Sequence, residues 1–336
     1  MIPAPYLLYL GHSDDAVGIK TSRGLAAFRR HDCVGEWRHD DSPLTLGLPR
    51  LDPTAARSAG ARTLVLGIAN AGGTLAPDLI EDALAAIAAG LHVAAGLHQR
   101  LRDHPRLVAA AAAAGVELYD VRDPPRDPRV GDGKRRAGKR LLTIGTDCSV
   151  GKMYATLCLR DELRARGIAA DFRATGQTGI LIAGEGVPVD AVVADFISGA
   201  IEALAPARED DGWDLIEGQG SLFHPSFAGV STGLLHGAQP AALLLCHDPS
   251  RAHMRGLPHY ALPGLDECLA ANLAVARLTS PDVRAVGVAL NTAALDEAAA
   301  RRLCEESAAR LSMPCTDPYR FGASPIADGM LACFAP

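Results

Sequence analysis

The sequence predicts an α/β protein with two domains, an N-terminal Rossmann-like parallel-sheet domain followed by a second, doubly wound domain. Along most of the 336 residues, short apolar runs alternate with helical stretches, a pattern typical of parallel sheets with crossover helices. A polar stretch interrupts this alternation once, at residues 126–139. Soon after it, a glycine-rich loop at residues 145–152 lies between a predicted strand and a predicted helix.

The N-terminal domain is expected over residues 1–125. Its predicted strands are 6–10, 63–68, 91–95 and 116–119, and its predicted helices are 78–89 and 105–114. A turn-rich segment with the cations Lys20, Arg23 and Arg30 is expected between the first two strands. Residues 126–139 lack apolar periodicity and are rich in Pro, Asp, Gly, Lys and Arg, so we expect a solvated linker there.

The second domain is expected over residues 140–336. Its predicted strands are 141–144, 168–172, 214–216, 242–246 and 283–290, and its predicted helices include 152–166 and 189–204. In a doubly wound sheet, ligands bind beyond the carboxyl ends of the strands. The loops that follow the strands are therefore where function is expected.

Composition narrows the class of protein. A net charge of −6 and a pI near 6.0 argue against nucleic acid as a partner. The eight cysteines form no CxxC pair or zinc-ligand spacing, so neither a disulfide framework nor a metal is expected, and a reducing cytoplasm fits best. The apolar run near the start of the chain, residues 6–10, is too short for a signal peptide or a membrane-spanning segment. We expect a cytoplasmic homo-oligomer with a small-molecule substrate and no membrane partner.

The strongest motif is the loop GTDCSVGK, directly after a strand and before a helix. A glycine-rich turn in this place directs backbone N–H groups and a helix N-terminus at a phosphate, and a lysine adds positive charge. This pattern predicts a P-loop NTPase-like domain. The residues expected to bind the cofactor are Gly145, Thr146, Asp147, Cys148, Ser149, Val150, Gly151 and Lys152.

Two departures separate this loop from the common phosphate loop. Five residues lie between Gly145 and Gly151 instead of four, and Met153 occupies the position where Ser or Thr would hold Mg²⁺. The longer spacing resembles the loop of dethiobiotin synthetase, as does Asn291 at the end of a later strand. A thioether does not ligate Mg²⁺, so we predict pyrophosphate binding without nucleotide hydrolysis.

Three further loops supply candidate residues at strand ends. Arg173, Thr175, Gln177 and Thr178 form a polar set suited to a carboxylate or phosphate, unless this loop only caps the helix expected from Val189. Arg251 follows a later strand and is also predicted to bind the substrate anion.

The loop EGQGSLFHP contains the predicted catalytic residues. Glu217 ends a strand at the position where P-loop proteins place a carboxylate facing the phosphates. His224 is a second candidate base with a pKa suited to neutral pH, and its alternative role is a structural cap before Pro225. The Ser221 hydroxyl or the N–H groups of this turn are expected to stabilise an oxyanion.

The motifs GTDCSVGKM, RATGQTGILIAGEGVPVDAVVADFISGA, EGQGSLFHP, GLLHG and CHDPSR together resemble one family. It is the P-loop family that includes the D-glutamate N-acetyltransferase of bacterial D-amino-acid catabolism. The resemblance implies acetyl transfer from acetyl-CoA to the amine of a D-amino acid, D-glutamate in that enzyme. Coenzyme A contains a pyrophosphate. A phosphate loop that lacks a Mg²⁺ ligand could therefore still bind this cofactor.

Two alternatives stay open at this point. One is an ATP- and Mg²⁺-dependent ligase or kinase resembling dethiobiotin synthetase, which would need Mg²⁺ ligands from Thr146, Asp147 or Glu217. The other is a non-catalytic nucleotide-binding module. Binding of coenzyme A or of ATP with Mg²⁺ discriminates among the three.

Overall fold

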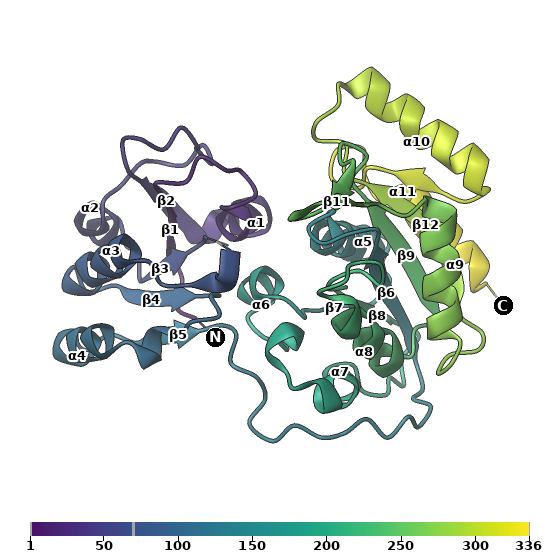
Figure 1. The fold of residues 1–336 in the computed structure, drawn as a ribbon, viewed down its shortest axis with the longest axis horizontal. Coiled ribbons are helices and arrows are strands. Elements are labelled where there is room, and N and C mark those ends of the chain that lie inside the picture. Colours follow the sequence, from purple (N-terminus) through teal and green to yellow (C-terminus); the bar gives the residue numbers. More distant parts are fainter. Residues whose placement is uncertain (1, 69–70, 336) are drawn as a thin grey trace. The chain divides into compact units, whose positions relative to one another are not determined.

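The computed structural model describes residues 2–68 and 71–335 and divides into two compact units (Figure 1). The N-terminal unit consists of residues 2–124 together with 177–191, and the C-terminal unit consists of residues 125–176 and 192–335. Residues 177–191 thus group with the N-terminal unit, although the sequence places them within the second domain. Within that unit the hydroxyls of Thr178 and Thr21 lie 2.9 Å apart, and Arg29 Nη1 donates to the carbonyl of Leu181 at 3.3 Å.

The N-terminal unit contains a five-stranded parallel sheet in the order β2-β1-β3-β4-β5. Its strands are β1 (Tyr6–Gly11), β2 (Cys33–Arg38), β3 (Thr63–Leu66), β4 (His92–Ala95) and β5 (Leu118–Asp120), and its helices are α1 (Lys20–Phe28), α2 (Pro53–Ser58), α3 (Pro77–Ala88), α4 (Pro105–Ala114) and α6 (Gln177–Ala183). The predicted parallel α/β sheet is confirmed. The segment expected as turns around Lys20 and Arg23 is the helix α1, and the edge strand β2 was missed because Glu36 and Arg38 interrupt its apolar pattern.

The C-terminal unit contains a six-stranded parallel sheet in the order β13-β12-β9-β6-β8-β7. Its strands are β6 (Lys139–Gly145), β7 (Ala170–Arg173), β8 (Trp213–Ile216), β9 (Ala242–His247), β12 (Arg284–Leu290) and β13 (Cys315–Thr316). A short antiparallel hairpin, β10 (His253–Met254) with β11 (Leu257–Ala261), follows β9. Strand β6 lies between β8 and β9 and is buried on both faces, so the loop after it starts at the centre of the sheet edge.

The helices of this unit are α5 (Lys152–Ala165), α7 (Ile197–Leu204), α8 (Ala228–Ala238), α9 (Leu265–Ala276), α10 (Glu297–Leu311) and α11 (Ser324–Cys333). The predicted helix 189–204 is wrong in its first half, where two 3-10 turns (Val189–Ala191 and Ala194–Phe196) precede α7. The adjacent β-branched residues Val192 and Val193 disfavour a continuous helix. Among the described residues, no helix combines the length and the apolar character needed to cross a membrane.

Candidate active site

The glycine-rich loop joins β6 to α5 and ends at an open helix N-terminus. The N-cap of α5 is Gly151, with a φ of 100°, and no side chain caps the helix. Ser149 also has a positive φ of 54°, so the loop takes backbone conformations that only a few residues tolerate easily. The first N–H groups of α5 have no acceptor within the helix, and the helix dipole is positive at this end. The loop therefore has the electrostatic character of an anion site.

Lys152 adds a full positive charge to this anion site. Its side chain is almost buried, with 6% of the residue exposed, and Nζ donates to the carbonyl oxygens of Asp147 at 2.8 Å and Gly220 at 2.9 Å. Across the described ranges, Lys152 takes part in no ion pair. A buried ammonium with only neutral acceptors attracts an anion strongly, because burial weakens the screening of its charge.

Two arginines hold the loop in shape. Arg251 Nη1 donates to Asp147 Oδ2 at 2.9 Å and to the Cys148 carbonyl at 2.7 Å, and its Nη2 donates to the Ser149 carbonyl at 2.7 Å. Arg255 donates from its backbone N–H to Asp147 Oδ2 at 2.7 Å and from Nη1 to Ser149 Oγ at 2.6 Å. The guanidinium of Arg251 is thus engaged with the loop, and its contact with substrate stays a prediction. Arg255 was missed, because no motif marks a residue in a two-residue hairpin turn.

The polar groups considered as Mg²⁺ ligands are hydrogen-bonded to other groups of the protein. Thr146 Oγ1 lies 2.9 Å from His247 Nδ1, and burial lowers the pKa of that imidazole. Asp147 accepts from both arginines and from the Cys148 N–H at 2.6 Å. His247, at the end of β9, is thus a further neighbour of the loop.

Glu217 directly follows β8 and has an unusual environment. It is 4% exposed, and its Oε2 accepts from the backbone N–H groups of Thr175 at 3.0 Å and Gly176 at 3.1 Å. Burial raises the pKa of the Glu217 carboxyl to about 7, against the lowering effect of these hydrogen bonds and of Lys152. A carboxyl with a pKa near neutral can take up and release protons under physiological conditions.

The glycine after Glu217 is required by the close approach of two strands. A Cβ at Gly218 would lie 1.7 Å from the Thr143 carbonyl oxygen, and the Gly218 N–H donates to Thr143 Oγ1 at 2.8 Å. Ser221 Oγ donates to the Thr146 carbonyl at 3.1 Å. These contacts join the loop after β8 to the phosphate loop, and they engage two of the predicted oxyanion donors.

His224 lies in the same loop, and both of its ring nitrogens are occupied. Nδ1 is 3.2 Å from the Ser226 N–H and Nε2 is 3.2 Å from the Arg255 carbonyl. With Nδ1 accepting and Nε2 donating, no lone pair is left for a substrate proton. The geometry thus favours Glu217 over His224 as the base.

The substrate residues predicted in the loop after β7 lie in three different settings. Arg173 pairs with Ile216 in register but its guanidinium reaches back to Asp214, with Nε and Nη2 each 2.8 Å from Oδ1. Thr175 holds Glu217, donating to its carbonyl at 2.5 Å through Oγ1. Gln177 and Thr178 begin the helix α6 and group with the N-terminal unit. Substrate binding by each of them stays a prediction.

Comparisons with known proteins agree with this architecture. A family model described as the DUF1611 C-terminal P-loop domain of unknown function matches residues 129–327, and one described as the DUF1611 N-terminal Rossmann-like domain of unknown function matches residues 31–124. A protein of Tritonibacter scottomollicae named D-glutamate N-acetyltransferase is 48% identical over 332 residues, which cover 99% of this chain and 100% of that protein. A protein of Pseudoalteromonas sp. with the same name is 46% identical over 325 residues, or 97% of this chain and 98% of that protein.

A solved structure shows the same fold. The crystal structure of a DUF1611 family protein from Anabaena variabilis ATCC 29413 matches with a TM-score of 0.90 and 33% identity, covering 98% of this chain and 100% of that one. The resemblance first inferred from the motifs is confirmed. The chain belongs to the DUF1611 family, with a Rossmann-like N-terminal domain and a P-loop C-terminal domain.

Proposed function

We propose that the protein is a D-glutamate N-acetyltransferase that uses acetyl-CoA as the acetyl donor. The observation that carries the proposal is the identity of 46–48%, over nearly the whole chain, to two relatives of that name. The site supports it independently, since an anion-binding loop without a hydroxyl after Lys152 suits a pyrophosphate that arrives without Mg²⁺.

The phosphate loop has the properties that coenzyme A requires. The uncapped N-terminus of α5 and the Lys152 ammonium offer N–H donors and positive charge, and Arg251 balances the negative charge of Asp147 within the loop. Acetyl-CoA would supply an activated acetyl thioester. The residues of this loop would hold its phosphates, and Arg251 and Arg255 would keep the loop in its binding conformation.

We assign the base to Glu217. An amine attacks an acyl carbon only after it has lost its proton, so the enzyme needs a group that accepts the proton near neutral pH. Glu217 meets this requirement because burial raises its pKa to about 7, and the N–H groups of Thr175 and Gly176 fix its orientation. The N–H groups of the turn that contains Ser221 stay our proposal for stabilising the negative charge that develops on the acyl oxygen, and the Ser221 hydroxyl would join them by leaving the Thr146 carbonyl.

The decisive experiment compares ligands and cations. Calorimetric titration with coenzyme A and with ATP, each in EDTA and in Mg²⁺, is expected to give coenzyme A binding that is independent of the metal. Incubation with acetyl-CoA and D-glutamate or L-glutamate, followed by mass spectrometry of the product, is expected to give N-acetyl-D-glutamate in preference. Met153→Thr should not create a Mg²⁺ requirement.

Two outcomes would overturn the proposal. Metal-dependent ATP binding with no coenzyme A binding would favour the hypothesis of a ligase or kinase. Binding of a nucleotide without any product from either amino acid would favour a non-catalytic module. A homo-oligomeric state and a cytoplasmic location belong to the same proposal, and light scattering on the purified protein tests the first.

A further inference from the structure

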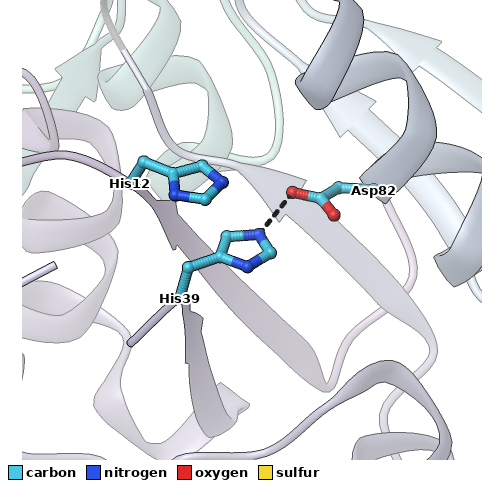
Figure 2. Close-up of side chains that lie close together, drawn as sticks. All are labelled: His12, His39 and Asp82. Carbon is cyan, nitrogen blue, oxygen red and sulfur yellow. Dashed lines mark hydrogen bonds and ion pairs between the residues drawn. The ribbon is translucent and has the colours of Figure 1, made fainter. Parts of the chain in front are cut away.

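Two histidines meet at the carboxyl edge of the N-terminal sheet. Strands β1 and β2 are parallel neighbours in which Gly11 pairs with Arg38, and His12 and His39 are the residues that directly follow these two. The His39 N–H donates to the Gly11 carbonyl at 3.1 Å. Their imidazole rings stack with centroids 3.9 Å apart and an interplanar angle of 1° (Figure 2). The topology of the sheet therefore brings two nitrogen ligands together from segments far apart in the sequence.

Asp82 of α3 adds a carboxylate to this pair. Its Oδ2 lies 2.8 Å from His39 Nε2 and also accepts a hydrogen bond from the hydroxyl of Tyr9, which is itself buried. Figure 2 shows the carboxylate of Asp82 facing the two rings. One donor atom from each of His12, His39 and Asp82 lies within 4.8 Å of the other two. A tetrahedral ion with bonds of ~2.0–2.1 Å needs ligand atoms ~3.3 Å apart. Binding would therefore turn the stacked rings toward the ion and displace the proton that His39 Nε2 donates to Asp82.

Asp41 orients His12 from behind. Its two carboxylate oxygens lie 2.8 and 2.9 Å from His12 Nδ1. Since a carboxylate only accepts, Nδ1 carries the proton, and in the neutral ring Nε2 then keeps a lone pair for a cation. A histidine whose other nitrogen donates to a carboxylate is the usual arrangement at protein metal sites, because it fixes the tautomer and raises the basicity of the ligand.

From this arrangement, we propose that His12, His39 and Asp82 bind a divalent transition-metal ion of the zinc class, with Asp41 orienting His12 through its Nδ1. Two imidazoles and one carboxylate favour Zn²⁺, Co²⁺ or Ni²⁺ over Mg²⁺ and Ca²⁺, which prefer sets made of oxygen. Three protein ligands leave a fourth position for water or a small anion. The side chains of His12 and Asp41 are 43% and 65% exposed, so an ion can reach the site from solvent.

A second cluster of possible metal ligands is less suited to a cation than the His12 site. Asp147, Cys148 and His224 also bring one donor atom each within 4.8 Å. There, however, Asp147 is paired with Arg251, and both ring nitrogens of His224 are hydrogen-bonded within the protein. A cation at that place would meet the positive charge of Arg251. At the His12 site a cation would instead meet the carboxylates of Asp41 and Asp82, which contact histidines.

Metal binding tests the proposal directly, on untagged full-length protein freed of metal by a chelator. Titration with Co²⁺ and Zn²⁺ is expected to give one equivalent at this site and a rise in Tm, since a ligand that binds only the folded state stabilises it. The visible spectrum of the Co²⁺ form should lack the charge-transfer band of a cysteine ligand. His12→Ala and His39→Ala should abolish this equivalent. Asp41→Asn should weaken binding by about 10- to 100-fold, the effect typical of removing a carboxylate that is hydrogen-bonded to a metal-binding histidine.

His31→Ala is the matched control, because His31 is an exposed histidine 3.3 Å from the carboxylate of Asp32 and belongs to no cluster of possible metal ligands among the described residues. It should leave the stoichiometry and the affinity unchanged. The proposal is overturned if the wild-type protein binds no Co²⁺ or Zn²⁺, or if the His12→Ala, His39→Ala double variant binds the same equivalents with the same spectrum. Asp41→Asn keeps the test valid if a histidine variant fails to fold, because Asp41 lies on the surface. The readout is binding, so the result is independent of the proposed acetyl transfer.

Discussion

The ammonium group of Lys152 donates a hydrogen bond of 2.9 Å to the carbonyl oxygen of Gly220. The bond crosses from the first residue of α5 to the turn that follows β8. It joins the phosphate loop to the loop that contains Glu217, so the cation expected to bind the cofactor and the carboxyl expected to serve as base belong to one connected structure.

Lys152→Ala should weaken the binding of coenzyme A by about ten- to a hundredfold. A charge-assisted hydrogen bond contributes roughly 1.5 to 3 kcal/mol, and each 1.4 kcal/mol corresponds to about a factor of ten. Calorimetric titration measures the change. Lys134→Ala, which removes a lysine with an 83% exposed side chain outside the site, is the control and should bind as the wild type does. Unchanged affinity in Lys152→Ala would remove the loop from the cofactor site.

Glu217→Gln should lower kcat/KM by about 10²- to 10⁴-fold, the usual contribution of a general base. In the wild type, kcat/KM should rise with pH through about 7 and then level off, because only the ionised carboxylate of Glu217 accepts a proton. The variant should lose this acidic limb. A profile with the same limb in Glu217→Gln would assign the base to another group.

His224→Asn separates the two candidate bases. Asparagine can still accept the hydrogen bond from the Ser226 N–H, so the loop should keep its shape. We expect the acidic limb of the pH profile to survive in this variant, since both nitrogens of His224 are already engaged. If His224→Asn loses the limb and Glu217→Gln keeps it, His224 is the base.

Glu217 should also make stability depend on pH. Burial raises its pKa in the folded state from 4.5 to about 7, so the folded protein binds more protons at Glu217 than the unfolded chain between these values. The contribution is present below about pH 4.5 and is lost as the pH rises through about 7. The Tm of Glu217→Gln minus the Tm of the wild type should therefore be larger at pH 8 than at pH 5. An identical difference at both pH values would show that Glu217 does not titrate in this range.

Arg173 is expected to act on stability more than on substrate binding. Arg173 and Arg208 both pair with the fully buried carboxylate of Asp214. Removing one partner of a buried ion pair costs on the order of 3 kcal/mol or more, and the remaining Arg208 should limit the loss. Thermal unfolding of Arg173→Ala measures this cost. A raised KM for the amino acid at unchanged Tm would instead support the original prediction that Arg173 binds a substrate carboxylate.

Much of the fold and part of the site could be predicted from local sequence. Strands such as β1 and β6 are buried on both faces, and a continuous apolar run identifies a strand of that kind without knowledge of its neighbours. The edge strand β2 has no such run, and the turn-rich sequence of α1 carries no clear period. Helix 189–204 was predicted too long because periodicity extends across a boundary between units that only the structure shows.

The sequence by itself determined the α/β class, the phosphate loop and the position of Glu217, because these depend on the order of residues along one strand, turn and helix. Only the tertiary structure decided the state and partners of those residues. Burial raises the pKa of Glu217. Two arginines, Arg251 and Arg255, contact the phosphate loop from the segment after β9. The guanidinium of Arg173 pairs with Asp214. His12, His39 and Asp82 meet because β1 and β2 end side by side near α3. Such contacts join residues distant in the chain, and no local pattern encodes a distance between two segments.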